Sequence, residues 1–143
     1  MSALRPRDRA GAFAQLKSPR ELPLFAYVTA FAATVPLLMR LPLPRAGALV
    51  TRAPGRPRAH AERLPALAAL APRLAHPLVR TGCLTRGVTL YWFLRRAGVD
   101  VELRFGLDPL TSDAHCWLTR AGEPYLERED PARFLETYRL PTA

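Results

Sequence analysis

Three residues in the C-terminal half of the chain have types and positions suited to nucleophilic catalysis. Cys83 opens an apolar helical pattern, His115 follows 32 residues later at the start of a strand pattern, and Glu127 lies 12 residues beyond His115. A thiolate at a helix N-terminus is stabilised by backbone donors and the helix dipole, and a neighbouring histidine activates it further. The spacing therefore predicts a thiol nucleophile, Cys83, with His115 as its base.

Such a site needs a third group that holds the imidazole in one orientation and tautomer, which a carboxylate or an amide can do. Glu127 is the first candidate, because His115 and Glu127 lie six positions either side of Ala121 in a predicted hairpin. A symmetric turn makes them face each other, and a shift of one residue makes them diagonal neighbours. Asp113 is the second candidate and Asp108 the third.

Other interpretations of the same residues stay open. A single cysteine at a helix start is often a small buried hydrophobe, and a single strand histidine is often a satisfied polar residue. A zinc site would use Cys83, His115 and Cys116, but Cys116 adjoins His115 on its strand and is expected to point to the opposite face. The sequence has no Cys-x-x-Cys or His-x-x-x-His pair, so we expect no metal and no cofactor.

The elements that must position these residues follow in the order helix, strand, hairpin. Apolar residues at helical spacing predict a helix from Cys83 to Ala97, which Gly98 ends. Alternation of apolar and polar residues predicts a strand over 99–107. We expect hairpin strands over 114–119 and 124–127, joined by Arg120-Ala-Gly122, and these elements together indicate an α+β fold.

Two proline-led motifs predict further helices. Asp130-Pro131 predicts the start of a last short helix through Tyr138. Ser18 with Glu21 forms a capping-box pattern around Pro19, which predicts the start of an apolar helix that runs to Met39 and is kinked or ended by Pro36.

Residues 22–39 carry no charge, and this run touches the lower length limit for a membrane span. Its two prolines, its threonines and its many alanines favour a helix that is buried or faces a partner. Proline-rich residues 42–58 are predicted to be a connector with a short helix over 45–51. Residues 59–75 are predicted to be helical, with interruptions near Pro65 and Pro72.

We expect residues 1–17 to be a flexible basic tail and residues 18–143 to form one domain, with a helical part (18–80) and a catalytic part (81–143). The formal net charge of +9 belongs to the N-terminal half, where residues 1–80 hold thirteen Lys and Arg against three acids. A basic surface attracts nucleic acid, anionic lipid or acidic peptides, but no interleaved aromatic and basic motif supports nucleic acid. Two cysteines and no visible signal peptide lead us to expect a cytoplasmic protein with reduced thiols.

Over about residues 64–130 the chain resembles the transglutaminase-like leader peptidases of lasso peptide biosynthesis. The resemblance is carried by Cys83-Leu-Thr-Arg-Gly, Leu94-Arg-Arg-Ala-Gly98, Leu103-Arg-Phe-Gly-Leu107 and Ala114-His-Cys-Trp-Leu118, followed by Gly122 and Glu127. Three positions depart from the family pattern. Cys116 and Gly87 stand where alanine is usual, and Glu127 stands where aspartate is usual.

The resemblance implies a cysteine peptidase that removes the leader from a ribosomally made precursor peptide through a Cys83–His115–Glu127 triad. It also implies two partners besides the precursor, a separate leader-recognition protein and an ATP-dependent macrolactam synthetase. Gly82 and Trp117 are candidates for the peptide groove, with a core aromatic as the alternative for Trp117. The main rival is a catalytically inactive adaptor of the same fold, which the glutamate at position 127 favours.

Overall fold

The computed structural model describes residues 11, 14–51, 55–56 and 61–141. Most of the predicted basic tail therefore lies outside the described residues. The order of elements is η1 (Pro19–Glu21), α2 (Leu22–Leu38), α3 (Leu43–Val50), η2 (Ala61–Arg63), α4 (Leu64–Leu74), α5 (Cys83–Arg96), β1 (Glu102–Leu107), β2 (Ala114–Arg120), β3 (Glu123–Tyr125), η3 (Pro131–Arg133) and β4 (Leu135–Leu140).

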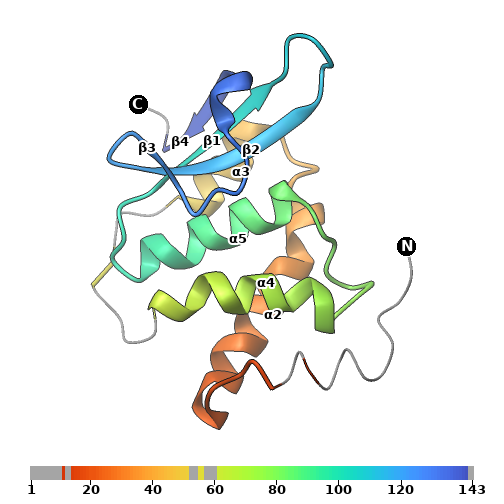
Figure 1. The fold of residues 1–143 in the computed structure, drawn as a ribbon, viewed down its shortest axis with the longest axis vertical. Coiled ribbons are helices and arrows are strands. Elements are labelled where there is room, and N and C mark those ends of the chain that lie inside the picture. Colours follow the sequence, from red (N-terminus) through yellow and green to blue (C-terminus); the bar gives the residue numbers. More distant parts are fainter. Residues whose placement is uncertain (1–10, 12–13, 52–54, 57–60, 142–143) are drawn as a thin grey trace.

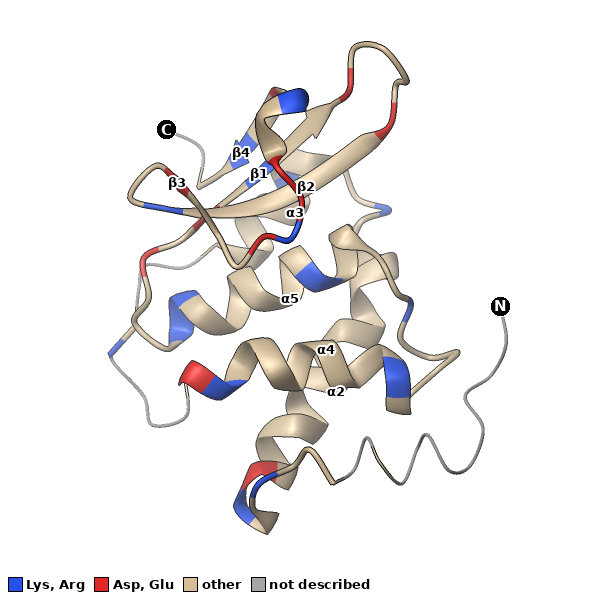
Figure 2. Ribbon diagram, in the orientation of Figure 1, with Lys and Arg blue, Asp and Glu red and all other residues tan. Residues whose placement is uncertain are grey.

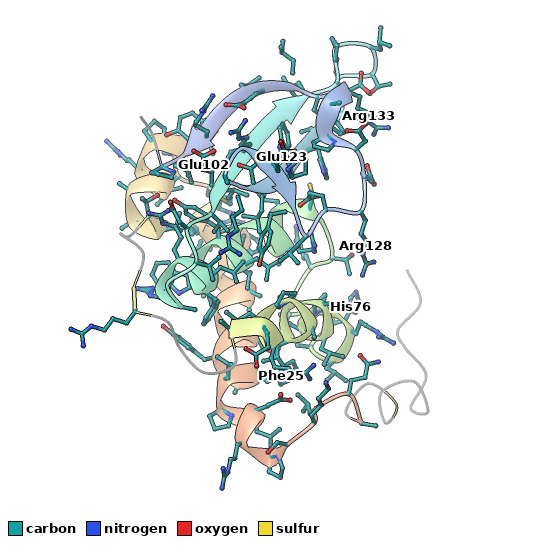
Figure 3. The ribbon with its side chains drawn as sticks, turned by 60° about the vertical axis from the view of Figure 1, so that its left-hand side comes forward. Phe25, His76, Glu102, Glu123, Arg128 and Arg133 are labelled. Carbon is teal, nitrogen blue, oxygen red and sulfur yellow. The ribbon has the colours of Figure 1, made fainter. Side chains whose placement is uncertain are left out.

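The molecule has an α+β architecture, as the sequence predicts. The four strands form one antiparallel sheet in the order β3-β2-β1-β4. Helix α5 lies beneath this sheet, and α2 and α4 cover the side of α5 that faces away from it (Figure 1). Figure 3 shows the same division, with Glu102 and Glu123 on the sheet and Phe25 among the helices.

Helix α5 is the centre of the core because it packs between two layers. Val88, Tyr91 and Leu94 are almost fully buried, and the sheet contributes Leu103 and Leu118 to the same cluster. Each such side chain contributes on the order of 1.5–3 kcal/mol when it leaves water. The fixed position of α5 against β1 and β2 fixes the first residue of the helix, Cys83.

The N-terminal helix begins close to where the capping pattern predicts. The Ser18 side chain accepts a hydrogen bond from the Arg20 amide, and Glu21 accepts one from the Lys17 amide at 2.9 Å. Glu21 also binds the Arg63 guanidinium at 2.7 Å, which joins the start of α2 to the start of α4. Pro36 lies inside α2, two residues before its end.

One face of α2 packs on α4 and α5 through four buried residues, Phe25, Val28, Ala32 and Val35. By length and composition alone, Pro19–Leu38 would also be sufficient for a membrane span. The expected short helix in the connector is α3, and the helical region after it is η2 and α4, with Pro65 in the first turn of α4 and Pro72 inside it.

The predicted last helix is wrong. Asp130 caps a single turn, η3, by accepting a hydrogen bond from the Ala132 amide, and the chain then extends as β4 along the free edge of β1. The segment Leu135–Leu140 includes Thr137 and Tyr138, residue types that favour strands. Pairing with β1 gives partners to the backbone groups on one side of this edge strand.

The predicted strands are approximately placed, and two of them are too long. Strand β1 starts at Glu102 rather than at residue 99, and β3 ends at Tyr125 rather than at residue 127.

Acidic positions are concentrated on the sheet and its loops, whereas the helical layer is mostly uncharged apart from its ends (Figure 2).

Candidate active site

Cys83 is the first residue of α5, as predicted, and it follows a glycine in a conformation that favours glycine. Gly82 has φ +150° and ψ 162°, a region that residues with a Cβ rarely adopt. Among the described residues, no side chain caps this helix end. The amide donors of its first turn and the positive end of the helix dipole therefore face the thiol and the space before it.

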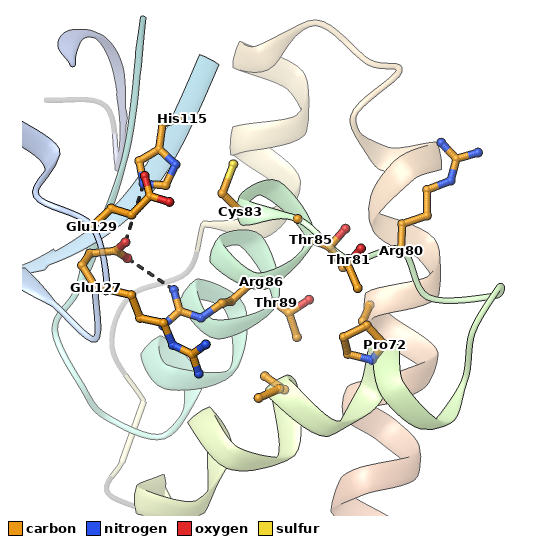
Figure 4. A pocket seen from close by; sticks show the side chains of 15 residues that line it. Pro72, Arg80, Thr81, Cys83, Thr85, Arg86, Thr89, His115, Glu127 and Glu129 are labelled. Atoms are coloured by element: carbon orange, nitrogen blue, oxygen red, sulfur yellow. Dashed lines mark hydrogen bonds and ion pairs between the residues drawn. The ribbon is translucent and has the colours of Figure 1, made fainter. Parts of the chain in front are cut away.

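His115 is the second residue of β2, and its ring packs against two aromatic side chains. The imidazole stacks on Phe134 with ring centroids 4.8 Å apart, and on Trp117 at 6.1 Å. Its Nε2 atom lies 3.7 Å from Oε2 of Glu127, and it has no hydrogen-bond partner among the described residues. Figure 4 shows the imidazole between Cys83 and Glu127.

Glu127 reaches His115 by a route that differs from the predicted hairpin. The turn is the two-residue pair Ala121-Gly122, with φ +51° and +85°, and Arg120 faces Glu123 across it. The strand pairing is therefore shifted by one residue from the arrangement centred on Ala121, in which His115 would face Glu127. Glu127 also lies past the end of β3, in a bend after Leu126, so the two residues are not opposite each other in a ladder.

The carboxylate of Glu127 is fixed by two hydrogen-bond donors, the Leu118 amide and the Arg86 side chain. It accepts a hydrogen bond from the Leu118 amide at 3.3 Å and pairs with the Arg86 guanidinium at 3.4 Å, and its side chain is 8% exposed. Arg86 also donates to the Leu126 carbonyl, so it holds the backbone of the bend as well. These contacts direct the second carboxylate oxygen toward the imidazole.

The open edge of β2 explains why the site assembles here. Because β3 has only three residues, it pairs with β2 from Leu118 to Arg120 and leaves the start of β2 uncovered. The Leu118 amide binds Glu127 and the Cys116 amide binds the Cys83 sulfur. Both residues are even-numbered, so these amides point to the same side of the strand. Along this edge of β2, the Cys83 sulfur and the Glu127 carboxylate thus accept hydrogen bonds from strand amides.

The Cys83 thiol is strongly acidified. Its pKa is lowered to about 5, first by a hydrogen bond from the Cys116 side chain, then by the Cys116 amide and by the hydrogen bond and charge of His115, against the opposing effect of burial. The same hydrogen bond and the burial of Cys116 raise the pKa of Cys116. Cys83 is therefore the thiolate of the pair, and Cys116 remains the protonated donor.

Arg86 and Cys116 are the contributors that sequence reasoning missed. Arg86 stands one turn after Cys83, so helical periodicity already put both on one face of α5. Cys116 does point away from the His115 face, as expected, but that direction leads to the first turns of α5 and so to Cys83. Alternation along the strand thus predicts the face of Cys116 correctly. The expectation that this face lies apart from the site is wrong, because Cys83 is on the same side.

The other candidates lie elsewhere. Asp113 accepts a hydrogen bond from the Thr111 hydroxyl at 2.8 Å, and Asp108 accepts hydrogen bonds from the Leu110 and Thr111 amides, so both order the β1–β2 loop. Trp117 is buried against Phe134 and the Gly106 backbone. It does not line the cavity in front of Cys83.

This cavity is open and has a volume of about 320 Å³ (Figure 4). Gly82, Cys83, His115 and Glu127 line one end of it, and small side chains of α2 and α4 line another part, including Ala32, Ala68, Ala69 and Pro72. Arg128 lies at the side where the sheet meets the helices (Figure 3). Among the residues that the structure describes, no three His, Cys, Asp or Glu side chains are grouped to hold a metal ion.

Comparison with protein families gives one match that spans most of the chain. The family model of the transglutaminase-like superfamily matches residues 27–139, which extend from within α2 to within β4 and include all three residues of the site. No curated protein and no solved structure matches the chain.

Proposed function

Because the chain belongs to the transglutaminase-like superfamily, which includes cysteine peptidases, we propose that it is a cysteine peptidase. Cys83 is the nucleophile, His115 the general base and acid, and Glu127 the group that orients His115. The observation that carries the proposal is the convergence of an acidified thiol, an imidazole and a buried carboxylate at one end of an open cavity.

In the proposed mechanism, the Cys83 thiolate attacks the carbonyl of a peptide bond, and the imidazolium of His115 retains the proton. The negative oxygen of the tetrahedral intermediate is stabilised by amides at the start of α5, including that of Cys83. His115 then protonates the leaving amine, and a thioester remains on Cys83. Water, deprotonated by His115, attacks the thioester carbonyl and releases the acid.

The proposed substrate is the leader–core junction of a ribosomally made precursor peptide, with the free core as the product of lasso peptide maturation. The support is the resemblance in the Cys83, Leu94, Leu103 and Ala114 motifs. We propose that a separate leader-recognition protein delivers the precursor in the cytoplasm, and that an ATP-dependent macrolactam synthetase consumes the core. We propose that either partner docks on the exposed apolar surface of α2 or on the basic N-terminal half of the chain.

A second candidate is an inactive adaptor that binds a peptide in the same cavity. One distance favours it, because 3.7 Å between Nε2 of His115 and Oε2 of Glu127 is longer than a hydrogen bond. Against it, the Cys83 thiol is acidified, which a binding role does not require. Catalytic hydrogen bonds are also often long in the unliganded state and tighten around substrate.

The test is cleavage of a lasso-type precursor peptide in the presence of a leader-recognition protein that binds it, followed by mass spectrometry of both fragments. We expect a single cut at the leader–core junction, and loss of the cut with Cys83→Ala or His115→Ala. The matched control is Arg73→Ala, a change at an exposed position on α4 away from the cavity. A Cys83→Ala protein that still supports maturation would favour the adaptor.

A further inference from the structure

Cys116 is a buried thiol that the proposed peptide hydrolysis does not need as a reactant. Its side chain is 4% exposed and belongs to the core beneath β2. The Cys116 sulfur lies against the backbone of Gly87, 3.1 Å from the position that a Cβ of residue 87 would occupy. Gly87 is four residues after Cys83, so the two stand on the same face of α5, one turn apart.

The Cys116 thiol is a neighbour of Cys83. Cys83 packs against the core cluster that contains Cys116, and the Cys116 side chain and amide both hydrogen-bond to the Cys83 sulfur. Both residues are free thiols in this structure. Their surroundings differ, because Cys83 lines the open cavity whereas Cys116 is enclosed by α5 and β1. A small reagent in solvent therefore reaches Cys83 first.

We propose that Cys116 is the resolving thiol of a redox pair, and that a hydroperoxide converts Cys83 and Cys116 into an intramolecular disulfide. The disulfide forms and breaks independently of any peptidase reaction. Its consequence, a reversible loss of the nucleophile, rests on the proposed function.

The reaction balances with one hydrogen peroxide for two thiols. The Cys83 thiolate attacks a peroxide oxygen, the O–O bond breaks, and a sulfenic acid is left on Cys83. The departing hydroxide forms water with the proton that the Cys83 thiol released when it ionised. The Cys116 sulfur then attacks the Cys83 sulfur, the S–S bond forms and the S–O bond breaks. The second hydroxide takes the Cys116 proton, so two thiols are oxidised and the peroxide is reduced to two waters.

The order of events follows from the charges. In the resting pair, Cys116 stays protonated because it donates to a neighbouring thiolate and is buried. When Cys83 becomes a neutral sulfenic acid, the negative charge that holds this proton is gone, and Cys116 loses its proton more easily. Without Cys116, the sulfenic acid stands in an open cavity where more peroxide oxidises it to the irreversible sulfinic acid.

The test treats the purified full chain with hydrogen peroxide and follows intact mass and free thiols. We expect the wild type to lose the mass of two hydrogen atoms and both thiols, and dithiothreitol to restore both. Cys116→Ala and Cys116→Ser should instead gain oxygen atoms on Cys83 that dithiothreitol does not remove. Cys83→Ser, in which the buried Cys116 is alone, should keep its mass over the same interval.

Circular dichroism verifies that each variant is folded. If one of the two variants at position 116 does not fold, the other still provides the test. Wild-type protein that gains oxygen atoms as readily as Cys116→Ala, without losing hydrogen, would overturn the proposal. Because the readout is a mass, a protein that forms the disulfide but cuts no precursor refutes the peptidase proposal and leaves this one standing. A protein that cuts the precursor but forms no disulfide refutes only the redox pair.

Discussion

The sulfur of Cys116 occupies space that a side chain at residue 87 would need. A Cβ on Gly87 would stand 3.1 Å from the Cys116 sulfur and 3.1 Å from Cδ1 of Leu103. Taken from the sequence alone, Gly87 and Cys116 are two unrelated departures from alanine. In the structure they compensate for each other, because the missing Cβ on α5 leaves room for the thiol beneath β2.

This compensation predicts non-additive stabilities. Gly87→Ala alone should gain little, since the roughly 1 kcal/mol of helix propensity is offset by crowding against Cys116. Gly87→Ala combined with Cys116→Ala should recover most of that gain. Urea unfolding of the four proteins measures the coupling. Additive free energies of unfolding would show that the two positions do not compete for space.

Glu127 is predicted to act by orienting His115. Glu127→Ala should lower kcat/KM for leader cleavage by on the order of 100-fold, the range expected when a general base loses its alignment. Glu127→Gln should fall between the wild type and Glu127→Ala, because its amide oxygen can still accept from Nε2 but cannot pair with Arg86. If all three proteins cleave equally well, another group orients His115.

Arg86 is predicted to act through Glu127. Arg86→Ala removes the 3.4 Å ion pair and the support of the Leu126 carbonyl, and kcat/KM should fall about tenfold, equivalent to roughly 1.4 kcal/mol. Arg86→Lys should recover part of this loss. In a Glu127→Ala background the same change should cost little, since the group it positions is absent. Equal losses in both backgrounds would indicate that Arg86 contacts substrate instead.

Phe134 is predicted to support both the fold and the imidazole. Phe134→Ala should lower the free energy of unfolding by about 3 kcal/mol, as for other buried aromatic residues. Phe134→Leu should restore most of the stability but not the ring that stacks on His115. NMR measures the second effect, because the His115 ring protons should shift in both variants. Unchanged resonances would mean that the stacking does not persist in solution.

The parts of the fold that sequence predicts are those set by local patterns. The apolar spacing from Cys83 to Ala97 predicted α5 to within one residue. Alternation predicted β1 with a start three residues too early, and the hairpin pattern predicted β2 to within one residue. The C-terminal strand was missed because Asp130-Pro131 is a genuine helix start whose helix lasts one turn. The conformation of the chain after that turn depends on the unpaired edge of β1, which is a tertiary feature.

The site was predictable in its members more than in its geometry. Residue chemistry and spacing indicated Cys83, His115 and Glu127, and the structure brings these three together. The contact between His115 and Glu127 was expected from pairing in a hairpin. It arises instead because β3 stops early and the bend at Leu126 turns Glu127 across the open edge of β2. Such a bend leaves no periodic signal in the sequence. Alternation gives the face on which Cys116 lies but not the neighbour that it meets there.

The central claim is that Cys83 is a thiolate activated by its neighbours, and the pH dependence of its alkylation tests this most directly. Iodoacetamide reacts with the thiolate, so a pKa of about 5 predicts half-maximal labelling near pH 5 and a flat rate above pH 7. Removing His115 or Cys116 should move the midpoint upward. Peptide mass spectrometry assigns the label to Cys83. A midpoint near 8.5, the value of an ordinary thiol, or one that ignores His115→Ala, would contradict the account.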